Sequence, residues 1–186
     1  VDESRFINFE QKPPEYFLYI GRFEPVKNPE RLIRAWNPEY GKLLMVGSGQ
    51  LEKDLIVLIK QLGLSNTIEL HSEIDDVGSL LSKAHALIIS SDREGSPKVL
   101  YEALYCKVPV LSTDCGNIAE VLPNESIAET NDKSFQHLLE KWVGKINELS
   151  LLQKNCFNQI KSKNLLSIQT QKVNSKYQEF LSIASR

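Results

Sequence analysis

Residues 86–103, ALIISSDREGSPKVLYEA, carry the clearest indication of the fold of this chain. An apolar strand over 86–89 is followed by a polar turn over 90–96 and by a helix that begins at Pro97. Glu94 lies in the turn above the helix N-terminus, and Glu102 lies on the second helical turn. Free amides at a helix N-terminus can hold an anion. Carboxylates accept hydrogen bonds from hydroxyl groups. We therefore expect a pocket for a ligand that carries both an anionic group and hydroxyl groups.

Similar units recur on both sides of this stretch. Further apolar runs cover 16–20, 42–46, 67–70, 108–111 and, more weakly, 126–128. Most runs are continuous, which is typical of parallel strands covered on both faces. Helical segments are predicted over 29–36, 51–62, 77–84 and from 132 onward. The alternation predicts an α/β fold, a doubly wound Rossmann-like parallel sheet flanked by helices.

The length and charge of the chain limit its class. Its 186 residues fit one domain, here 15–186 with C-terminal helices, and the polar lead-in 1–14 is expected to be a linker or edge segment. The net charge of -2 gives no electrostatic case for a nucleic-acid partner. No apolar run approaches the roughly 20 residues that a membrane-spanning helix needs. Because the only methionine is Met45, we expect a segment of a longer protein.

The three cysteines and three histidines show no metal-ligand spacing, so no metal site is predicted. Cys106 is expected to be a small buried residue on a helix. Without a disulfide framework, a reducing cytoplasm is the expected compartment. His71 ends a predicted strand, and a structural, hydrogen-bonded role is favoured over a functional one.

Two loops after predicted strands carry candidate binding residues. In the first, Gly21 precedes Arg22 and Lys27, and two cations at this edge suit a diphosphate. A solvated basic pair, with one cation bonded to Glu24, is the alternative. In the second, Gly47 and Gly49 would let the backbone approach a ligand closely, although Gly47 could simply turn the chain.

The quoted stretch offers a third site, at the start of its helix. Ser96 is expected to cap the helix with Pro97 at its first position, so that the amides of Lys98 and Val99 point toward an anion. Three other interpretations remain open here. Ser96 could satisfy those amides itself, Lys98 and Glu102 could form a surface ion pair, and Glu94 could be a solvated acid.

The order and spacing of four segments together are specific. GRFEPVKN, LLMVGSGQL, SSDREGSPKVLYEA and KVPVLSTDCGNIAEVL resemble the carboxy-terminal half of GT-B fold glycosyltransferases, in particular glycosyltransferase family 4. The resemblance covers about residues 16–130. It departs at Lys107 and Asn117, where the family commonly has glycine. If Lys107 is left-handed, lysine costs roughly 1 kcal/mol there.

The resemblance implies roles for individual residues. Arg22 and Lys27 would hold the diphosphate of the donor, Glu94 would lie near the transferred sugar, and Glu102 would bind ribose hydroxyls. Ile74 is a looser match to the segment that contacts the base. The remaining donor-binding positions form the loops and the helix end around sugar and phosphate: Gly21, Gly47, Gly49, Gly95, Ser96, Lys98 and Val99.

The expected function is that of a donor-binding domain of a retaining glycosyltransferase, inactive alone, that uses a nucleotide diphosphate sugar and no cofactor or metal. A glycan or lipid-linked acceptor would bind the absent amino-terminal domain, in polysaccharide biosynthesis. The full-length enzyme would be cytoplasmic, with peripheral association with the inner face of the membrane left open. A nucleotide-sugar epimerase and a non-catalytic nucleotide-binding domain are the alternatives.

Overall fold

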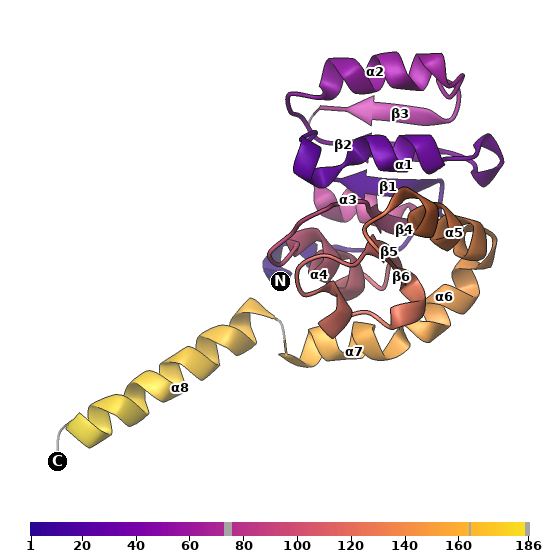
Figure 1. The fold of residues 1–186 in the computed structure, drawn as a ribbon. Coiled ribbons are helices and arrows are strands. Elements are labelled where there is room, and N and C mark those ends of the chain that lie inside the picture. Colours follow the sequence, from indigo (N-terminus) through magenta and orange to yellow (C-terminus); the bar gives the residue numbers. More distant parts are fainter. Residues whose placement is uncertain (73–75, 164, 185–186) are drawn as a thin grey trace.

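A computed structural model describes residues 1–72, 76–163 and 165–184. Six strands form one sheet in the order β3-β2-β1-β4-β5-β6, and each strand pair is parallel (Figure 1). The strands are β1 (Tyr16–Ile20), β2 (Leu43–Val46), β3 (Ile68–His71), β4 (Ala84–Ile89), β5 (Val110–Thr113) and β6 (Ile127–Ala128). All residues of β2 and β5 are buried, as expected for continuous apolar runs between two helical layers. The predicted doubly wound sheet is confirmed, and its strand order reverses between β1 and β4.

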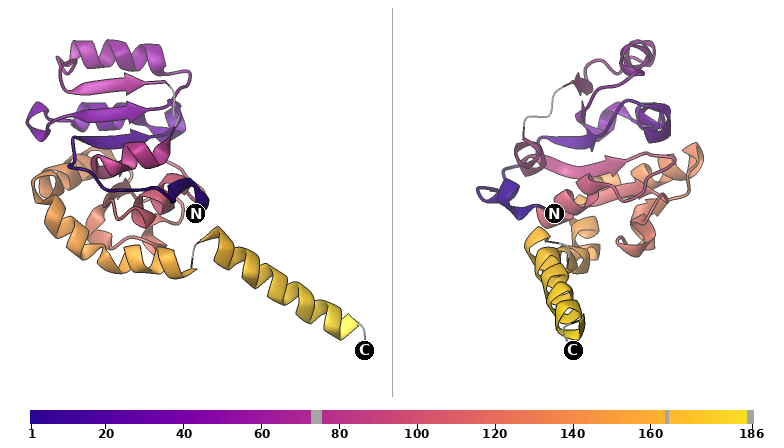
Figure 2. Two further views of the ribbon diagram at one scale, coloured as in Figure 1. Left: turned by 180° about the vertical axis from the view of Figure 1, so that it is seen from behind. Right: turned by 90° about the vertical axis from the view of Figure 1, so that its left-hand side faces the viewer.

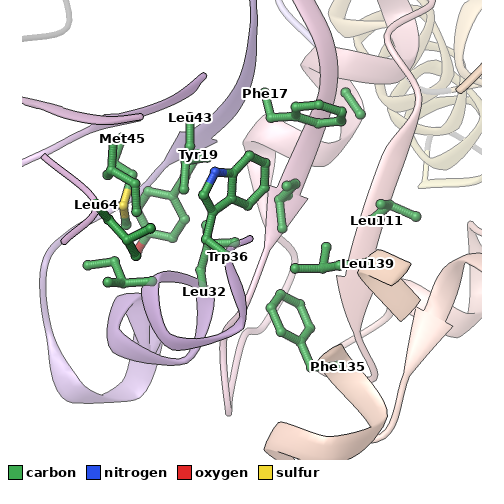
Figure 3. Close-up of a cluster of buried hydrophobic side chains, with 14 of the residues drawn as sticks. Phe17, Tyr19, Leu32, Trp36, Leu43, Met45, Leu64, Leu111, Phe135 and Leu139 are labelled. Atoms are coloured by element: carbon green, nitrogen blue, oxygen red, sulfur yellow. The ribbon is translucent and has the colours of Figure 1, made fainter. Parts of the chain in front are cut away.

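Helices cover both faces of the sheet (Figure 2). On one face lie α1 (Pro29–Ala35), α2 (Glu52–Gln61) and α5 (Asp132–Trp142). Figure 3 shows their core with Phe17 of β1 beside Trp36, the two rings 5.3 Å apart. On the other face lie α3 (Val77–Ser82), α4 (Lys98–Tyr105) and α7 (Lys154–Lys163). The short α6 (Ile146–Leu152) leads from α5 to α7, and α8 (Leu166–Ala184) extends away from the sheet (Figures 1 and 2).

The N-terminal segment, predicted as a linker or edge segment, forms no strand within residues 1–14. A 3-10 turn over Glu3–Phe6 places Phe6, which is 5% exposed, in the core cluster of α3 and α4. Further along, the amide of Lys12 donates to the carbonyl of Ser82 at 2.9 Å. We call residues 1–14 the N-terminal arm. The arm is attached to the helical layer along its length.

Lys107 and Asn117 occupy the two positions where the family that the sequence resembles commonly has glycine, and their backbone conformations differ. Cys106, buried as predicted, is the C-cap of α4, and Lys107 follows with φ of 59°, in the left-handed region. Asn117, the other position where the family commonly has glycine, is not left-handed, since its φ is -101°. The left-handed position in that loop is Gly116, with φ of 60°, so the glycine lies one residue earlier than the resemblance suggests.

Replacing Lys107 with glycine is expected to raise the free energy of unfolding by about 1 kcal/mol, because glycine has no Cβ to strain a left-handed backbone. Urea unfolding measures the change. Lys60→Gly on the exposed side of α2 is the matched control and is expected to lose about 1 kcal/mol, since glycine weakens a helix. A loss of stability in Lys107→Gly contradicts the account.

Candidate functional site

A cavity of about 260 Å³ lies at the carboxyl edge of the sheet, where the ends of β1 and β4 meet the start of α4. This is the point at which the strand order reverses, the usual ligand position in open α/β sheets. Half of the predicted site residues line it together: Gly21, Lys27, Glu94, Ser96, Lys98 and Val99. The structure thus brings together side chains that are far apart in sequence.

Lys27 and Glu94 form the charged centre of this cavity. A 3-10 turn over Pro25–Lys27 directs the lysine inward, and its Nζ lies 2.5 Å from Oε2 of Glu94. The other carboxylate oxygen accepts a hydrogen bond of 2.8 Å from Ser91. The side chains are only 19% and 11% exposed, so Glu94 is not the solvated loop acid that the sequence left open.

The start of α4 differs from the expectation by one residue. Pro97 has extended backbone angles and is the N-cap, so the first helical residue is Lys98. Ser96 does not cap the helix, because its hydroxyl is directed to the Tyr101 hydroxyl at 3.4 Å instead. Within the described residues no side chain caps this end. The amides of Lys98 and Val99 are therefore left for another acceptor, which a helix N-terminus favours when it is anionic.

Glu102 lies on the second turn of α4 with a partner that the sequence did not indicate. Its Oε1 is 2.5 Å from Nη1 of Arg5, 97 residues away on the N-terminal arm. The expected alternative, an ion pair with Lys98, is not formed, and Lys98 is exposed. Arg5 and Glu102 line a second cavity of about 530 Å³, which shares Ser96 and Lys98 with the first. No motif in the polar lead-in could have identified Arg5.

Gly47 and Gly49 lie beside backbone of the chain itself. A Cβ on Gly47 would come within 1.9 Å of the Gly21 carbonyl oxygen, and one on Gly49 within 2.5 Å of the Phe23 carbonyl oxygen. The two loops are also bonded to each other, for example from the Phe23 amide to the Ser48 carbonyl at 2.8 Å. These glycines let the loops after β1 and β2 pack together, and they do not line the 260 Å³ cavity.

Three other predicted residues lie outside this cavity or outside the described residues. The Arg22 side chain is 69% exposed and forms an ion pair with Glu24 at 2.7 Å, the alternative that the sequence left open. Gly95 contributes its carbonyl to the packing of Gly116, whose added Cβ would lie 2.5 Å away. Ile74 falls outside the described residues.

Two buried polar residues support the site without having been predicted. Thr113 at the end of β5 donates a hydrogen bond of 2.5 Å to the Ser91 carbonyl, which fixes the turn that carries Glu94. Tyr19 lines the cavity and donates to the Arg22 carbonyl at 3.3 Å. Burial raises the pKa of Tyr19, and the carboxylates of Glu94 and Glu24 raise it further, so the phenol stays protonated. No signal in the sequence indicated Thr113, because its partner lies 22 residues away in the loop after β4. Tyr19 was predicted only as part of an apolar strand.

Across residues 1–72, 76–163 and 165–184, no three His, Cys, Asp or Glu side chains are grouped so as to hold a metal ion. In the same residues, no helix has the length and apolarity needed to cross a membrane.

Comparison with known proteins identifies a family to which the chain is similar. The family model described as glycosyl transferases group 1 matches residues 1–158. The chain is 29% identical over 109 residues to N-acetyl-alpha-D-glucosaminyl L-malate synthase of Bacillus anthracis, covering 56% of the chain and 29% of that protein. It is 29% identical over 147 residues to the O-antigen chain mannosyltransferase RfbU of Salmonella typhimurium, covering 75% and 41%.

Solved structures agree on the fold. Anabaena Alr3699/HepE in complex with UDP superimposes with a TM-score of 0.79 at 17% identity, covering 89% of this chain and 49% of that one. Its fold, like that of the other structural neighbours, is GT-B. The chain spans less than half the length of these curated relatives.

Proposed function

Since the chain belongs to the glycosyl transferases group 1 family, we propose that it is the donor-binding part of a retaining glycosyltransferase that uses a nucleotide diphosphate sugar. One observation supports this most strongly. The cavity between β1 and β4 combines a lysine-held carboxylate with an uncapped helix N-terminus. A sugar diphosphate offers hydroxyl groups for the carboxylate and an anion for the amides.

The diphosphate is proposed to bind Lys27, Lys98 and the amides of Lys98 and Val99. A lysine ammonium has three donors, and Glu94 uses one of those on Lys27, so two remain for phosphate oxygens. Arg22 would also bind the diphosphate, after its ion pair with Glu24 has broken. Exposed ion pairs are worth only about 0–1 kcal/mol, so this exchange is inexpensive. Gly21 would supply backbone close to the ligand, and Gly95 would hold the turn between Glu94 and Ser96 against Gly116. Gly47 and Gly49 would act by holding the Gly21 loop in place.

The proposed reaction breaks the bond between the anomeric carbon and the diphosphate. The electron pair stays on the leaving phosphate, and the acceptor hydroxyl forms the new bond on the same face of the sugar. Groups that bind the growing negative charge stabilise the transition state more than the ground state. Glu94 would orient the sugar, and Glu102 would accept hydrogen bonds from the ribose. Since both oxygens of Glu94 are already hydrogen-bonded, we assign it no covalent role.

The acceptor, a glycan or a lipid-linked glycan, is proposed to bind residues outside this chain, with 15–186 as the donor domain. Cytoplasmic residence at the inner face of the membrane belongs to the same proposal. It is supported by the free cysteines Cys106, Cys115 and Cys156.

An epimerase would need an acid and a base at the sugar, and a purely binding domain would need neither. His71 does not line the 260 Å³ cavity, and its side chain is 57% exposed. The full-length protein, incubated with labelled nucleotide sugars and candidate glycan acceptors, separates the three functions. We expect transfer with the anomeric configuration kept. Isomerised donor would indicate an epimerase, and binding without turnover a non-catalytic domain.

A further inference from the structure

The Glu102 carboxylate is nearly enclosed and holds one strong bond. Its side chain is 10% exposed, and Oε1 accepts the Arg5 guanidinium at 2.5 Å. Within the described residues, Oε2 accepts no hydrogen bond, and the carboxylate lines the 530 Å³ cavity beside Lys98 and Tyr101. Burying a charge this deeply is costly without a compensating partner. Arg5 is that partner, and it leaves the second oxygen available to a ligand.

Arg5 is held in this position from both sides. The neighbouring Phe6 is buried, with its ring 5.5 Å from that of Tyr105 on α4. On the other side, the Glu3 carboxylate accepts the amides of Leu166 and Ser167 at the start of α8, at 3.2 and 3.3 Å. The N-terminus therefore lies beside both α4 and α8 (Figures 1 and 2). Because the arm is attached on both sides of Arg5, the position of the guanidinium is restricted. The orientation of the Glu102 carboxylate, which is bonded to it, is restricted as well.

Resting on the proposed function, in which Glu102 accepts ribose hydroxyls, we propose that Arg5 is a positioning residue for the donor. Each carboxylate oxygen has two acceptor sites, so one bond from Arg5 leaves three for a pair of vicinal hydroxyls. The guanidinium fixes the plane of the carboxylate through the bond to Oε1. The N-terminal arm thereby contributes to nucleotide affinity through Glu102, without touching the phosphates.

If the N-terminal arm has only a structural role, the expected effect of losing Arg5 is different. If Arg5 only tied the arm to α4, its loss would weaken every nucleotide by the same factor. If it positions Glu102, the loss depends on the hydroxyls that Glu102 binds. The ratio of affinities for a ribonucleoside diphosphate and its 2′,3′-dideoxy form therefore distinguishes the two roles.

The test measures this ratio by calorimetry on the 186-residue chain, with UDP, GDP, CDP and ADP and their 2′,3′-dideoxy forms. Arg5→Gln is expected to weaken the tightest ribonucleotide about tenfold, the effect of one charge-assisted hydrogen bond, and to leave its dideoxy form unchanged. Arg5→Lys keeps the charge and is expected to stay within about threefold of the parent. Lys12→Gln is the matched control, because it removes one exposed charge from the same arm, and no change is expected.

The outcomes separate the two proposals. Equal weakening of both nucleotide forms, or no weakening in Arg5→Gln, overturns the positioning role and leaves the proposed function standing. A parent chain that binds none of the four nucleotides overturns both. Circular dichroism checks folding. If Arg5→Gln does not fold, Arg5→Met, which keeps most of the aliphatic stem and removes the charge, is measured in its place, and the same two outcomes apply to its ratio.

Discussion

Replacing Lys27 with methionine is expected to lower the free energy of unfolding by about 1–3 kcal/mol, because removing one partner of a partly buried ion pair leaves Glu94 without its compensating charge. Glu94 is 11% exposed, and only Ser91 would remain to hold it. Urea unfolding measures the loss. Lys60→Met on the exposed side of α2 is the control and is expected to change stability by less than about 0.5 kcal/mol.

The double variant Lys27→Met/Glu94→Gln separates stability from binding. A neutral pair of similar volume is expected to recover most of the lost stability, since replacing both members of a buried pair is often neutral. Nucleoside diphosphate affinity is expected to stay at least about tenfold below that of the parent, because the cation is gone. A double variant that is folded and binds normally contradicts the phosphate role of Lys27. A Lys27→Met variant as stable as the parent contradicts a stabilising role for the ion pair.

Replacing Gly47 with alanine is expected to cost about 3 kcal/mol or more, because its Cβ would lie 1.9 Å from the Gly21 carbonyl oxygen. The clash is with backbone, so rotation of a side chain cannot relieve it. The loop after β1, which carries Lys27, would have to move. Thermal and urea unfolding measure the cost, and nucleoside diphosphate affinity is expected to fall with it.

Gly63→Ala is the matched control for this variant. Gly63 has φ of 70°, and an added Cβ there meets nothing within 4 Å, so only backbone strain of about 1–2 kcal/mol is expected. The difference between the two variants is the contribution of the loop contact. Equal losses would show that the close approach of the two loops is not needed for stability.

The fold was predictable because its signals are local. Runs such as 42–46 are continuous and apolar, and the structure buries β2 on both faces, within a residue of the predicted bounds. Burial of Cys106 followed from its residue type and its place near a helix end. The left-handed Lys107 was suggested by comparison with the glycine common in the family, since its own side chain gives no such signal.

The site was predictable only in part, because its contacts are not local. Lys27 and Glu94 were both candidates, but their pairing across 67 residues depends on β1 lying beside β4. Arg5 was missed for the same reason. The error at Ser96 is different, because capping rules favour serine, whereas the extended backbone of Pro97 moves the helix start by one residue.

We propose above all that the cavity between β1 and β4 binds a pyrophosphate at the start of α4. The most direct test is an NMR titration of the isotope-labelled chain with UDP, GDP, CDP and ADP, following each backbone amide. The account predicts that the largest shift changes fall on Gly21, Lys98 and Val99, which line that cavity. Changes centred instead on His85 and Lys145, which line a cavity at the start of β4, would contradict it.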